Sequence, residues 1–342
     1  MKYITSQQDT TYFHWQIETY LNNFEKVGID LSQCHVVLIY ENKISDTAKI
    51  LVEKYREVNF HFYKMPFKGY IAAVKPYGMW QLSKEIDLDV VFYHDADIIF
   101  TEPINFDELI EGETSYMSET LQRGGKSYID LEYLSEFEGI IEGLTDIIGV
   151  EPKQHGGGAQ YILKGMPSEY WEKVYKDCFP VHDFLKNSKT KVQVWCAEMW
   201  STLWNVWYFG KEIELHSKLD FCMSRDDIED LKPIVHNAGI MDRGYFAKGS
   251  WRNRYPRLDL EIKKDLCNHV YYEEISYIRA MGKIRIIKDG ASDAVTRQVY
   301  KIGDVVDLGD SRNENAVKGG YAEFIKTEKK EGKPKRTKRA KK

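Results

Sequence analysis

Apolar residues follow two alternating spacings over the first hundred residues of the chain. Short apolar runs, typical of strands, occupy 1–7, 35–41, 59–65 and 90–100. Segments with apolar residues at helical spacing lie between them, at 14–29, 46–58 and 75–86. This alternation predicts an α/β fold with a mostly parallel sheet and helices on both faces. In such sheets, ligands bind beyond the carboxyl ends of the strands.

The run VVFYHDADIIF, residues 90–100, carries two acids into the end of an apolar strand. Asp95 and Asp97 need compensation there, because an unpaired buried carboxylate is costly. The candidates are a metal ion, a basic side chain, or solvent at the strand end. Hard carboxylate oxygens suit Mg²⁺ or Mn²⁺, so we expect a metal site, with a pair of solvated acids as the alternative.

A further candidate ligand lies far along the chain, in IVHNAGIMDRGYFAKGSW, residues 234–251. His236 follows a short apolar run, and a neutral imidazole is a reasonable third ligand for Mn²⁺. A single histidine is more often structural, but its pairing with the two acids favours the metal site. Lys248 in the same stretch can neutralise charge on a diphosphate leaving group.

Two other stretches carry candidate chemistry. HGGGAQYILKG, residues 155–165, places three glycines before an apolar run, which lets the backbone approach a ligand closely; a flexible turn is the alternative. Residues 192–210 are dense in aromatic side chains, and we expect most of the tryptophans there to be in the core. Glu198 lies among them, so it should have a raised pKa or a dedicated partner, unless it lies on the helix surface.

The last part of the chain has a different composition. Short β-rich runs between Gly and Asp predict a small module at 279–325, after an α/β domain at 1–278. Residues 326–342 hold ten Lys or Arg and two Glu, which leaves a net charge of −13 on the rest of a chain whose total is −5. This tail has almost nothing to bury, so we expect it to be disordered, either as a solvated terminus or as an arm for a polyanion.

Composition argues against several classes of protein. No run of about 18 apolar residues is present, so we expect no membrane span, and the first residues lack the pattern of a secretory signal. The five cysteines are scattered and form no C-x-x-C pair, which argues against a disulfide framework or a zinc cluster. We therefore expect a cytoplasmic protein that makes no membrane contact.

In combination, HDADIIF, GGGAQYILKG, WCAEMW and HNAG with a later Lys-Gly-x-Trp resemble the metal-dependent, nucleotide-sugar glycosyltransferases of the GT-A fold. The resemblance is to the hydroxyproline O-arabinosyltransferase and peptidyl-serine galactosyltransferase-like group, including phage-encoded members. The opening YITSQQDTTYFHWQIETYLNNF fits that group, and the resemblance covers roughly residues 1–275. Residues 279–325 resemble an accessory module common in phage-encoded proteins, which would place the chain in the host cytoplasm.

The resemblance implies a metal site and a catalytic site. Asp97 would ligate Mn²⁺ (or Mg²⁺) directly, Asp95 would contact the metal or the ribose of the donor, and His236 would ligate from the far side. Glu198 or Gln160 would stabilise positive charge on the transferred sugar.

The resemblance also implies a binding site for the UDP-sugar donor. Lys248, with Arg243 as its rival, would lie near the diphosphate; eight residues separate Gly239 from Lys248, and Gly249 replaces the proline of the glycogenin-like pattern. The other implied contacts with the donor and the acceptor side are made by Thr5, Ser6, Lys75, His94, Asp95, Gly158, Ala159, Gln160 and Gly239.

The implied reaction moves a sugar from a UDP-sugar to a hydroxyl of a protein or small molecule, and the family likeness favours retention of configuration. One alternative is a glycosyltransferase that modifies hydroxylated bases of phage DNA, held by the module and the basic tail. Another is a non-catalytic phage structural or adaptor protein that retains the fold, against which Asp95, Asp97 and His236 together argue. A nucleotidyltransferase should carry a basic Gly-rich loop near the N-terminus, and YITSQQD is not one.

Overall fold

The computed structural model describes residues 1–119, 131–153, 157–190, 192–239, 244–257, 260–281, 284–286, 288, 299–306 and 321–324. The basic tail and Arg243 lie outside these residues. The chain divides into two compact units, Met1–Glu274 and Ile275–Lys342. The helix α10, Asn268–Met281, contains the point of division.

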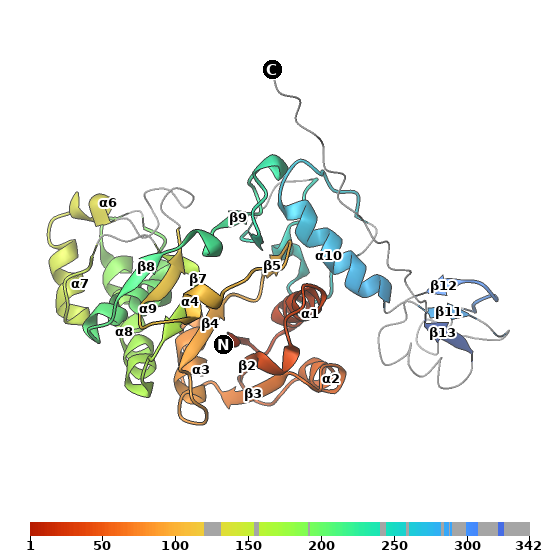
Figure 1. The fold of residues 1–342 in the computed structure, drawn as a ribbon, viewed down its shortest axis with the longest axis horizontal. Helices are drawn as coiled ribbons and strands as arrows, with labels where there is room; N and C mark the ends of the chain where they lie inside the picture. The colour runs from red at the N-terminus through yellow and green to blue at the C-terminus, as the bar shows by residue number, and fades with distance from the viewer. Residues whose placement is uncertain are drawn as a thin grey trace, which may run out of the picture. The chain divides into compact units, whose positions relative to one another are not determined.

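Unit 1 is built on a seven-stranded mixed sheet with the strand order β3-β2-β1-β4-β7-β6-β8 (Figure 1). Its strands are β1 Lys2–Gln8, β2 Cys34–Tyr40, β3 Asn59–Lys64, β4 Val90–His94, β6 Ser115–Ser118, β7 Gly158–Lys164 and β8 Ile213–Leu215. β3, β2, β1 and β4 pair in parallel, β7 is antiparallel to β4 and to β6, and β8 is parallel to β6. The expected α/β fold with a mixed, mostly parallel sheet is confirmed, and it is consistent with a GT-A-like arrangement.

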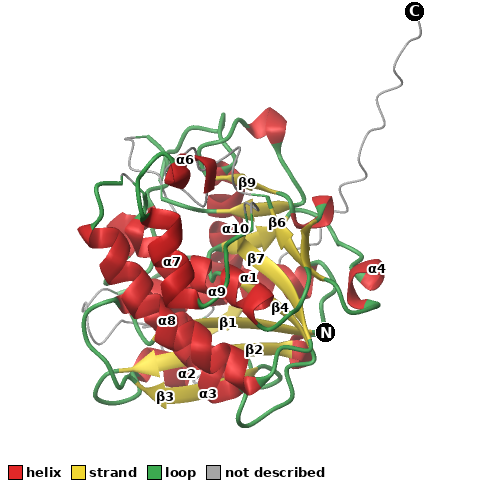
Figure 2. Cartoon of the chain, turned by 90° about the vertical axis from the view of Figure 1, so that its left-hand side faces the viewer, coloured by secondary structure: helices red, strands yellow, loops and turns green. Residues whose placement is uncertain are grey.

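Helices cover both faces of this sheet. The helices of unit 1 before α10 are α1 Thr11–Lys26, α2 Asp46–Lys54, α3 Val74–Leu82, α4 Asp107–Ile110, α6 Leu131–Ser135, α7 Ile140–Ile148, α8 Ser168–Asn187 and α9 Ala197–Tyr208. Residues of α1 and α2 form one core with one face of the sheet, and α3, α7, α8 and α9 form the other, which Figure 2 shows from the side of α8. Trp200, Trp204 and Trp207 of α9 are buried as expected, whereas Trp195 is 56% exposed.

Residues 90–100 form two strands rather than one, and the two acids follow the end of the first strand, as expected. β4 ends at His94, and β5, Ile98–Phe100, belongs to a separate three-stranded sheet with the order β5-β10-β9. β10, Ile234–His236, is antiparallel to β5 and parallel to β9, Phe221–Met223. The chain therefore turns between two sheets at the Asp-Ala-Asp sequence, because β5 pairs with β10 and leaves the main sheet.

Unit 2 holds a three-stranded antiparallel sheet, with the order β12-β11-β13, among its described residues. The strands are β11 Ile284–Ile286, β12 Val305–Val306 and β13 Ala322–Phe324. Each lies within a run that was expected to be β. The expected boundaries of the module and the role of the tail stay predictions.

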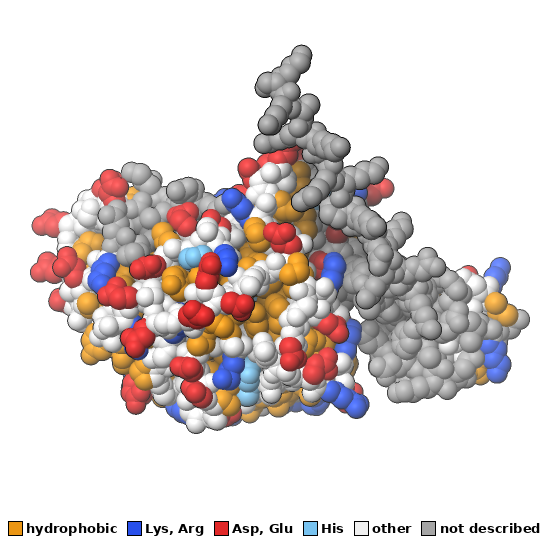
Figure 3. Space-filling view, in the orientation of Figure 1, with side chains coloured by type: hydrophobic (Ala, Val, Ile, Leu, Met, Phe, Trp, Pro, Cys, Tyr) orange, Lys and Arg blue, Asp and Glu red, His pale blue; other side chains and the backbone are white. Residues whose placement is uncertain are grey.

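The surface and the cysteines bear on the expected class of the protein. Figure 3 shows Asp and Glu side chains spread over the face of unit 1 in view, in keeping with the acidic composition outside the tail. All five cysteines lie among the described residues; they are buried and form no disulfide bond. Among the described residues, no helix combines the length and the apolar character that crossing a bilayer requires.

The close approach of α3 to β1 requires a glycine. A Cβ atom at Gly78 would lie 2.0 Å from Ser6 Oγ and 2.8 Å from Val37 Cγ1. The Ser6 hydroxyl is held in place because it donates to the Val74 carbonyl at 2.9 Å. We expect Gly78→Ala to lower the free energy of unfolding by about 1–3 kcal/mol, measured by urea denaturation.

Two further variants test this explanation. Gly249→Ala should change the free energy of unfolding by less than about 0.5 kcal/mol, because a Cβ atom there meets no described atom within 4 Å. Adding Ser6→Ala to Gly78→Ala should restore part of the lost stability, because it removes the nearest atom. A Gly78→Ala protein as stable as the wild type would show that α3 can move away at no cost.

Candidate active site

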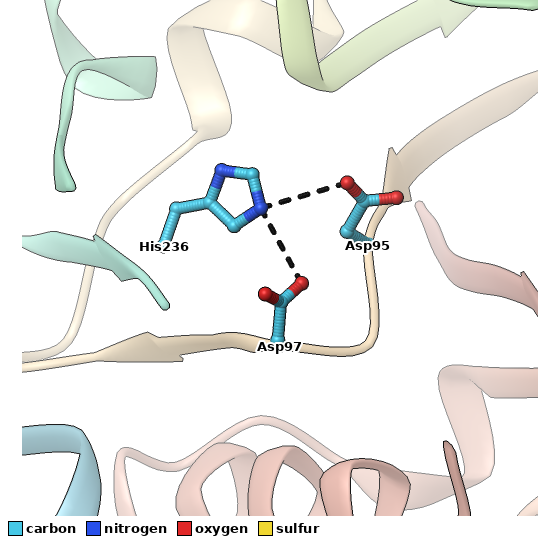
Figure 4. A group of neighbouring side chains, drawn as sticks. All are labelled: Asp95, Asp97 and His236. Atoms are coloured by element: carbon cyan, nitrogen blue, oxygen red, sulfur yellow. Dashed lines mark ion pairs between the residues drawn. The ribbon is translucent and has the colours of Figure 1, made fainter. Parts of the chain in front are cut away.

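Asp95, Asp97 and His236 meet where β4, β5 and β10 come together (Figure 4). His236 Nε2 lies 3.5 Å from Asp95 Oδ2 and 3.3 Å from Asp97 Oδ1. The register of β5 and β10 produces this arrangement, because it sets His236 opposite Ile98, and the Asn237 N–H donates to the Asp97 carbonyl at 2.8 Å. The sequence therefore identified three residues that the fold brings together.

Two lysines compensate the negative charges of Asp95 and Asp97. Lys75 Nζ lies 2.6 Å from Asp95 Oδ1, and Lys248 Nζ pairs with Asp97 Oδ2. The oxygens that the lysines leave free, Asp95 Oδ2 and Asp97 Oδ1, are the two that face His236. Basic side chains thus neutralise both carboxylates, while one oxygen of each remains directed at a shared point.

This donor set fits a hard divalent cation. One ligand atom from each of Asp95, Asp97 and His236 lies within 4.8 Å of the other two. Neighbouring ligands of an octahedral ion with bonds of about 2.1 Å lie about 3 Å apart, close to the separations between His236 and the two acids. The two carboxylates suit Mn²⁺ or Mg²⁺, and the imidazole favours Mn²⁺ of the two.

The electrostatics of this group depend on close charge pairing. Burial favours the neutral form of Asp97, but Lys248 and His236 outweigh burial and hold the pKa of Asp97 well below its usual range. Burial also opposes the charge on Lys75, and the carboxylates of Asp95 and Glu198 outweigh it and raise the pKa of Lys75 well above its ordinary value. Asp97, Lys75 and Lys248 therefore carry their charges at neutral pH.

Lys248 reaches Asp97 because α1 supports its loop. The 3₁₀ turn Lys248–Trp251 is fixed to α1 where the Trp15 indole N–H donates to the Trp251 carbonyl at 3.1 Å. Tyr12, also on α1, lies within the electrostatic reach of this pair; its pKa is raised, mainly by burial. No sequence pattern marked Tyr12. Arg243, the predicted rival of Lys248, lies outside the described residues.

Glu198 has the dedicated partners that its aromatic surroundings called for. It is only 1% exposed, which excludes a position on the helix surface. Its Oε1 lies 3.1 Å from Lys75 Nζ, and its Oε2 lies 2.6 Å from Tyr70 Oη, which also accepts the Glu198 N–H at 3.0 Å. Lys75 thus connects Asp95 to Glu198. Tyr70 was missed because nothing in its local sequence indicates a partner so far along the chain.

A small pocket opens beside Lys75 and Asp95. It is lined by Lys75, Tyr93, Asp95, Ala159, Tyr161, Glu198, Met199 and Thr202. The backbone of Ala159 has a φ of 62°, a left-handed conformation that is rare without glycine and is found at functional sites more often than elsewhere. Four of the predicted site residues, Lys75, Asp95, Ala159 and Glu198, therefore share one pocket.

Several other predicted residues lie elsewhere. Thr5 and Ser6 are fully buried in β1, where Gln7 Nε2 donates to Thr5 Oγ1 at 3.2 Å. Gln160 is also fully buried; its Nε2 donates to the Leu219 carbonyl at 2.6 Å, and it does not line the pocket. Their roles toward the donor stay predictions.

The two predicted glycines differ in their surroundings. The Gly158 carbonyl accepts a hydrogen bond from the Ser118 hydroxyl at the start of β7. Gly239 follows the end of β10, and a Cβ atom there would meet no described atom within 4 Å. The structure gives neither glycine a contact with the three ligand residues, and their roles in donor binding also stay predictions.

His94 lies in an aromatic cluster next to the turn that contains Asp95 and Asp97. Its ring contacts Tyr20, Phe24 and Phe92, and its Nδ1 lies 2.8 Å from the Asp95 carbonyl oxygen. Its side chain is almost fully buried, and burial lowers its pKa from 6.5 to about 4. In this position His94 supports the turn, and its predicted contact with the donor stays a prediction.

The lowered pKa of His94 predicts a pH dependence of stability. The folded protein keeps His94 neutral between pH 6.5 and about 4, whereas the unfolded chain takes up a proton there. The free energy of unfolding should therefore fall as the pH is lowered through this window, by on the order of 3 kcal/mol from this group. His94→Phe, which keeps a ring but cannot titrate, should show a smaller fall in urea denaturation series; an equal fall in both proteins would contradict the assignment.

No protein-family model matches the chain, and no curated protein is significantly similar to it in sequence. Solved structures that resemble it include the glycosyltransferase GlyE of Streptococcus pneumoniae TIGR4, with a TM-score of 0.44 and 10% identity over 81% of this chain and 61% of that one. WbbM, a bifunctional glycosyltransferase, has a TM-score of 0.47 and 10% identity over 81% and 49%. Mouse xyloside xylosyltransferase 1 has a TM-score of 0.37 and 8% identity over 69% and 97%. The alignments thus span about half to three fifths of GlyE and WbbM, and scores of this size define no family.

Proposed function

We propose that this protein is a metal-dependent glycosyltransferase that moves a sugar from a UDP-sugar to a hydroxyl acceptor. The observation that carries the proposal is the convergence of Asp95, Asp97 and His236 beyond the carboxyl end of β4, with the free oxygen of each acid facing the imidazole. This end of an open α/β sheet is where ligands bind. The resemblance of the sequence to GT-A glycosyltransferases supports the same function.

The charge of each residue would determine its role in the reaction. Asp95, Asp97 and His236 would hold Mn²⁺ or Mg²⁺, which would neutralise negative charge on the donor diphosphate. Lys248, partly buried beside Asp97, would add positive charge near the leaving diphosphate. Glu198, fixed by two partners, would stabilise positive charge on the anomeric carbon. Gln160 is the other candidate for this role, and the family likeness favours retention.

The charge balance of the site supports joint binding of metal and donor. Three carboxylates, of Asp95, Asp97 and Glu198, face two ammonium groups, of Lys75 and Lys248. A divalent cation turns this single negative charge into a positive one, which favours an anionic diphosphate. By linkage, the diphosphate must favour the cation to the same extent.

The test is a screen for donor binding and hydrolysis with Mn²⁺ or with EDTA. The probes are UDP, UDP-glucose, UDP-galactose, UDP-xylose and UDP-N-acetylglucosamine. We expect UDP to bind only when Mn²⁺ is present and at least one UDP-sugar to be hydrolysed slowly without an acceptor. If no probe is bound or hydrolysed in a Mn²⁺-dependent way, the enzyme proposal fails and a non-catalytic adaptor becomes the better explanation.

The acceptor is proposed to be a hydroxyl of a protein or a small molecule. The basic tail, residues 326–342, favours hydroxylated bases of phage DNA as the alternative, because ten basic residues would attract a polyanion. Deleting the tail separates the two: transfer to DNA should weaken sharply and depend on salt, whereas transfer to a small acceptor should not change. For a phage-encoded protein the setting would be the host cytoplasm.

A further inference from the structure

One hydroxyl in the pocket has no partner. The Tyr161 side chain is 2% exposed, it lines the pocket, and its Oη has no hydrogen-bond partner among the described residues. A buried hydroxyl without a partner is costly, so native proteins nearly always complete such groups with water or a ligand. The unpaired Tyr161 hydroxyl therefore indicates that something polar enters this pocket.

Four of the other polar side chains around the pocket are already engaged. Lys75 lies between Asp95 and Glu198, and Glu198 is also bonded to Tyr70. The Thr202 hydroxyl donates to the Glu198 carbonyl at 2.8 Å. Tyr161 thus differs from Lys75, Glu198 and Thr202 in having its hydrogen-bonding capacity unused.

The size and place of the pocket limit what can enter. The space among its side chains admits about one water-sized group, too little for a sugar ring. Asp95 lines the pocket and also belongs to the proposed metal site, so the pocket adjoins the place where the donor diphosphate would lie. A sugar attached to that diphosphate could reach the pocket with a single substituent.

We propose that this pocket receives one hydroxyl of the donor sugar, and that Tyr161 Oη is its hydrogen-bond partner. Tyr161 is then a specificity-determining residue, which selects donors that carry a hydroxyl at the matching position. The lining favours a hydroxyl over an apolar group, because the charged side chains of Lys75 and Glu198 also line this pocket. This inference rests on the proposed function and names the part of the substrate that the pocket recognises.

The test separates the contribution of the sugar to donor binding from that of the nucleotide. Calorimetry in Mn²⁺ gives the Kd for UDP and for UDP-glucose, UDP-galactose, UDP-xylose and UDP-N-acetylglucosamine, and the ratio of the UDP value to each UDP-sugar value measures what the sugar adds. In Tyr161→Phe we expect this ratio to fall about tenfold for the best donor, with the Kd for UDP unchanged, because one hydrogen bond is lost. The ratio between the largest and the smallest Kd among the four UDP-sugars should fall by a similar factor.

A matched control is Tyr271→Phe. Tyr271 is fully buried, its hydroxyl makes no hydrogen bond of good geometry with a described residue although Thr19 lies close to it, and it does not line the pocket. Its substitution should leave the ratios unchanged. The inference is overturned if wild-type protein binds UDP and all four UDP-sugars equally, if Tyr161→Phe keeps the wild-type ratios, or if both variants change them alike; the pocket then holds water only. A wild-type protein that binds no UDP would instead contradict the proposed function itself.

Discussion

Asp97→Asn is expected to reduce Mn²⁺-dependent hydrolysis of the UDP-sugar by about a thousandfold. Asp97 offers one oxygen to the proposed metal site and pairs with Lys248 through the other. The substitution should therefore weaken metal binding and remove the negative charge that pairs with Lys248. Metal stabilisation of a leaving group contributes several kcal/mol, and about 4 kcal/mol corresponds to this factor. The measurement compares initial rates at saturating Mn²⁺, and Mn²⁺ binding is followed separately by electron paramagnetic resonance of the free ion.

The same substitution should also destabilise the protein, by about 3 kcal/mol, because Lys248 loses its counter-charge at a position where solvent reaches it only partly. A second substitution distinguishes the two effects. Adding Lys248→Met removes the unpaired ammonium group, so the double variant should regain stability in urea denaturation while its activity stays low. Activity that returns together with stability would mean that Asp97 supports only the fold.

Lys75→Met should destabilise the protein by about 3–5 kcal/mol, the largest stability effect that we expect from a single change. Lys75 bridges two carboxylates, Asp95 at 2.6 Å and Glu198 at 3.1 Å. Its removal leaves two negative charges in a poorly solvated pocket, which is far costlier than removing a complete pair. The measurement is the free energy of unfolding from urea titration at pH 7.

A double-mutant cycle with Glu198→Gln tests the bridge. Lys75→Met with Glu198→Gln should be more stable than the sum of the single effects predicts, by about 1–3 kcal/mol, because the two groups interact directly. Glu198→Gln alone should lower sugar transfer about a hundredfold while keeping the hydrogen bond to Tyr70. Additive stability effects would show that Lys75 and Glu198 do not depend on each other.

The alternating elements of the first hundred residues could be predicted because periodicity is a local property. A residue's spacing from its apolar neighbours reports which side of its own helix or strand is buried. The same local reasoning identified Asp95, Asp97, His236 and Glu198, because charged or imidazole groups beside apolar runs require compensation wherever the chain folds. The residues that the fold brings together around Asp97 could therefore be identified in part from the sequence.

Which groups provide that compensation was decided by the tertiary structure alone. The turn after β4 seemed to continue one strand, and only the pairing of β5 with β10 shows that the chain enters a second sheet there. Lys75 and Lys248 reach the acids from distant parts of the sequence. Tyr70 has no recognisable signal in its local sequence, and nothing in GGGAQYILKG marks Tyr161 as a residue that lines the pocket. Burial of a face is encoded locally, but which distant faces meet depends on strand order and register, and these are fixed only when the whole chain packs.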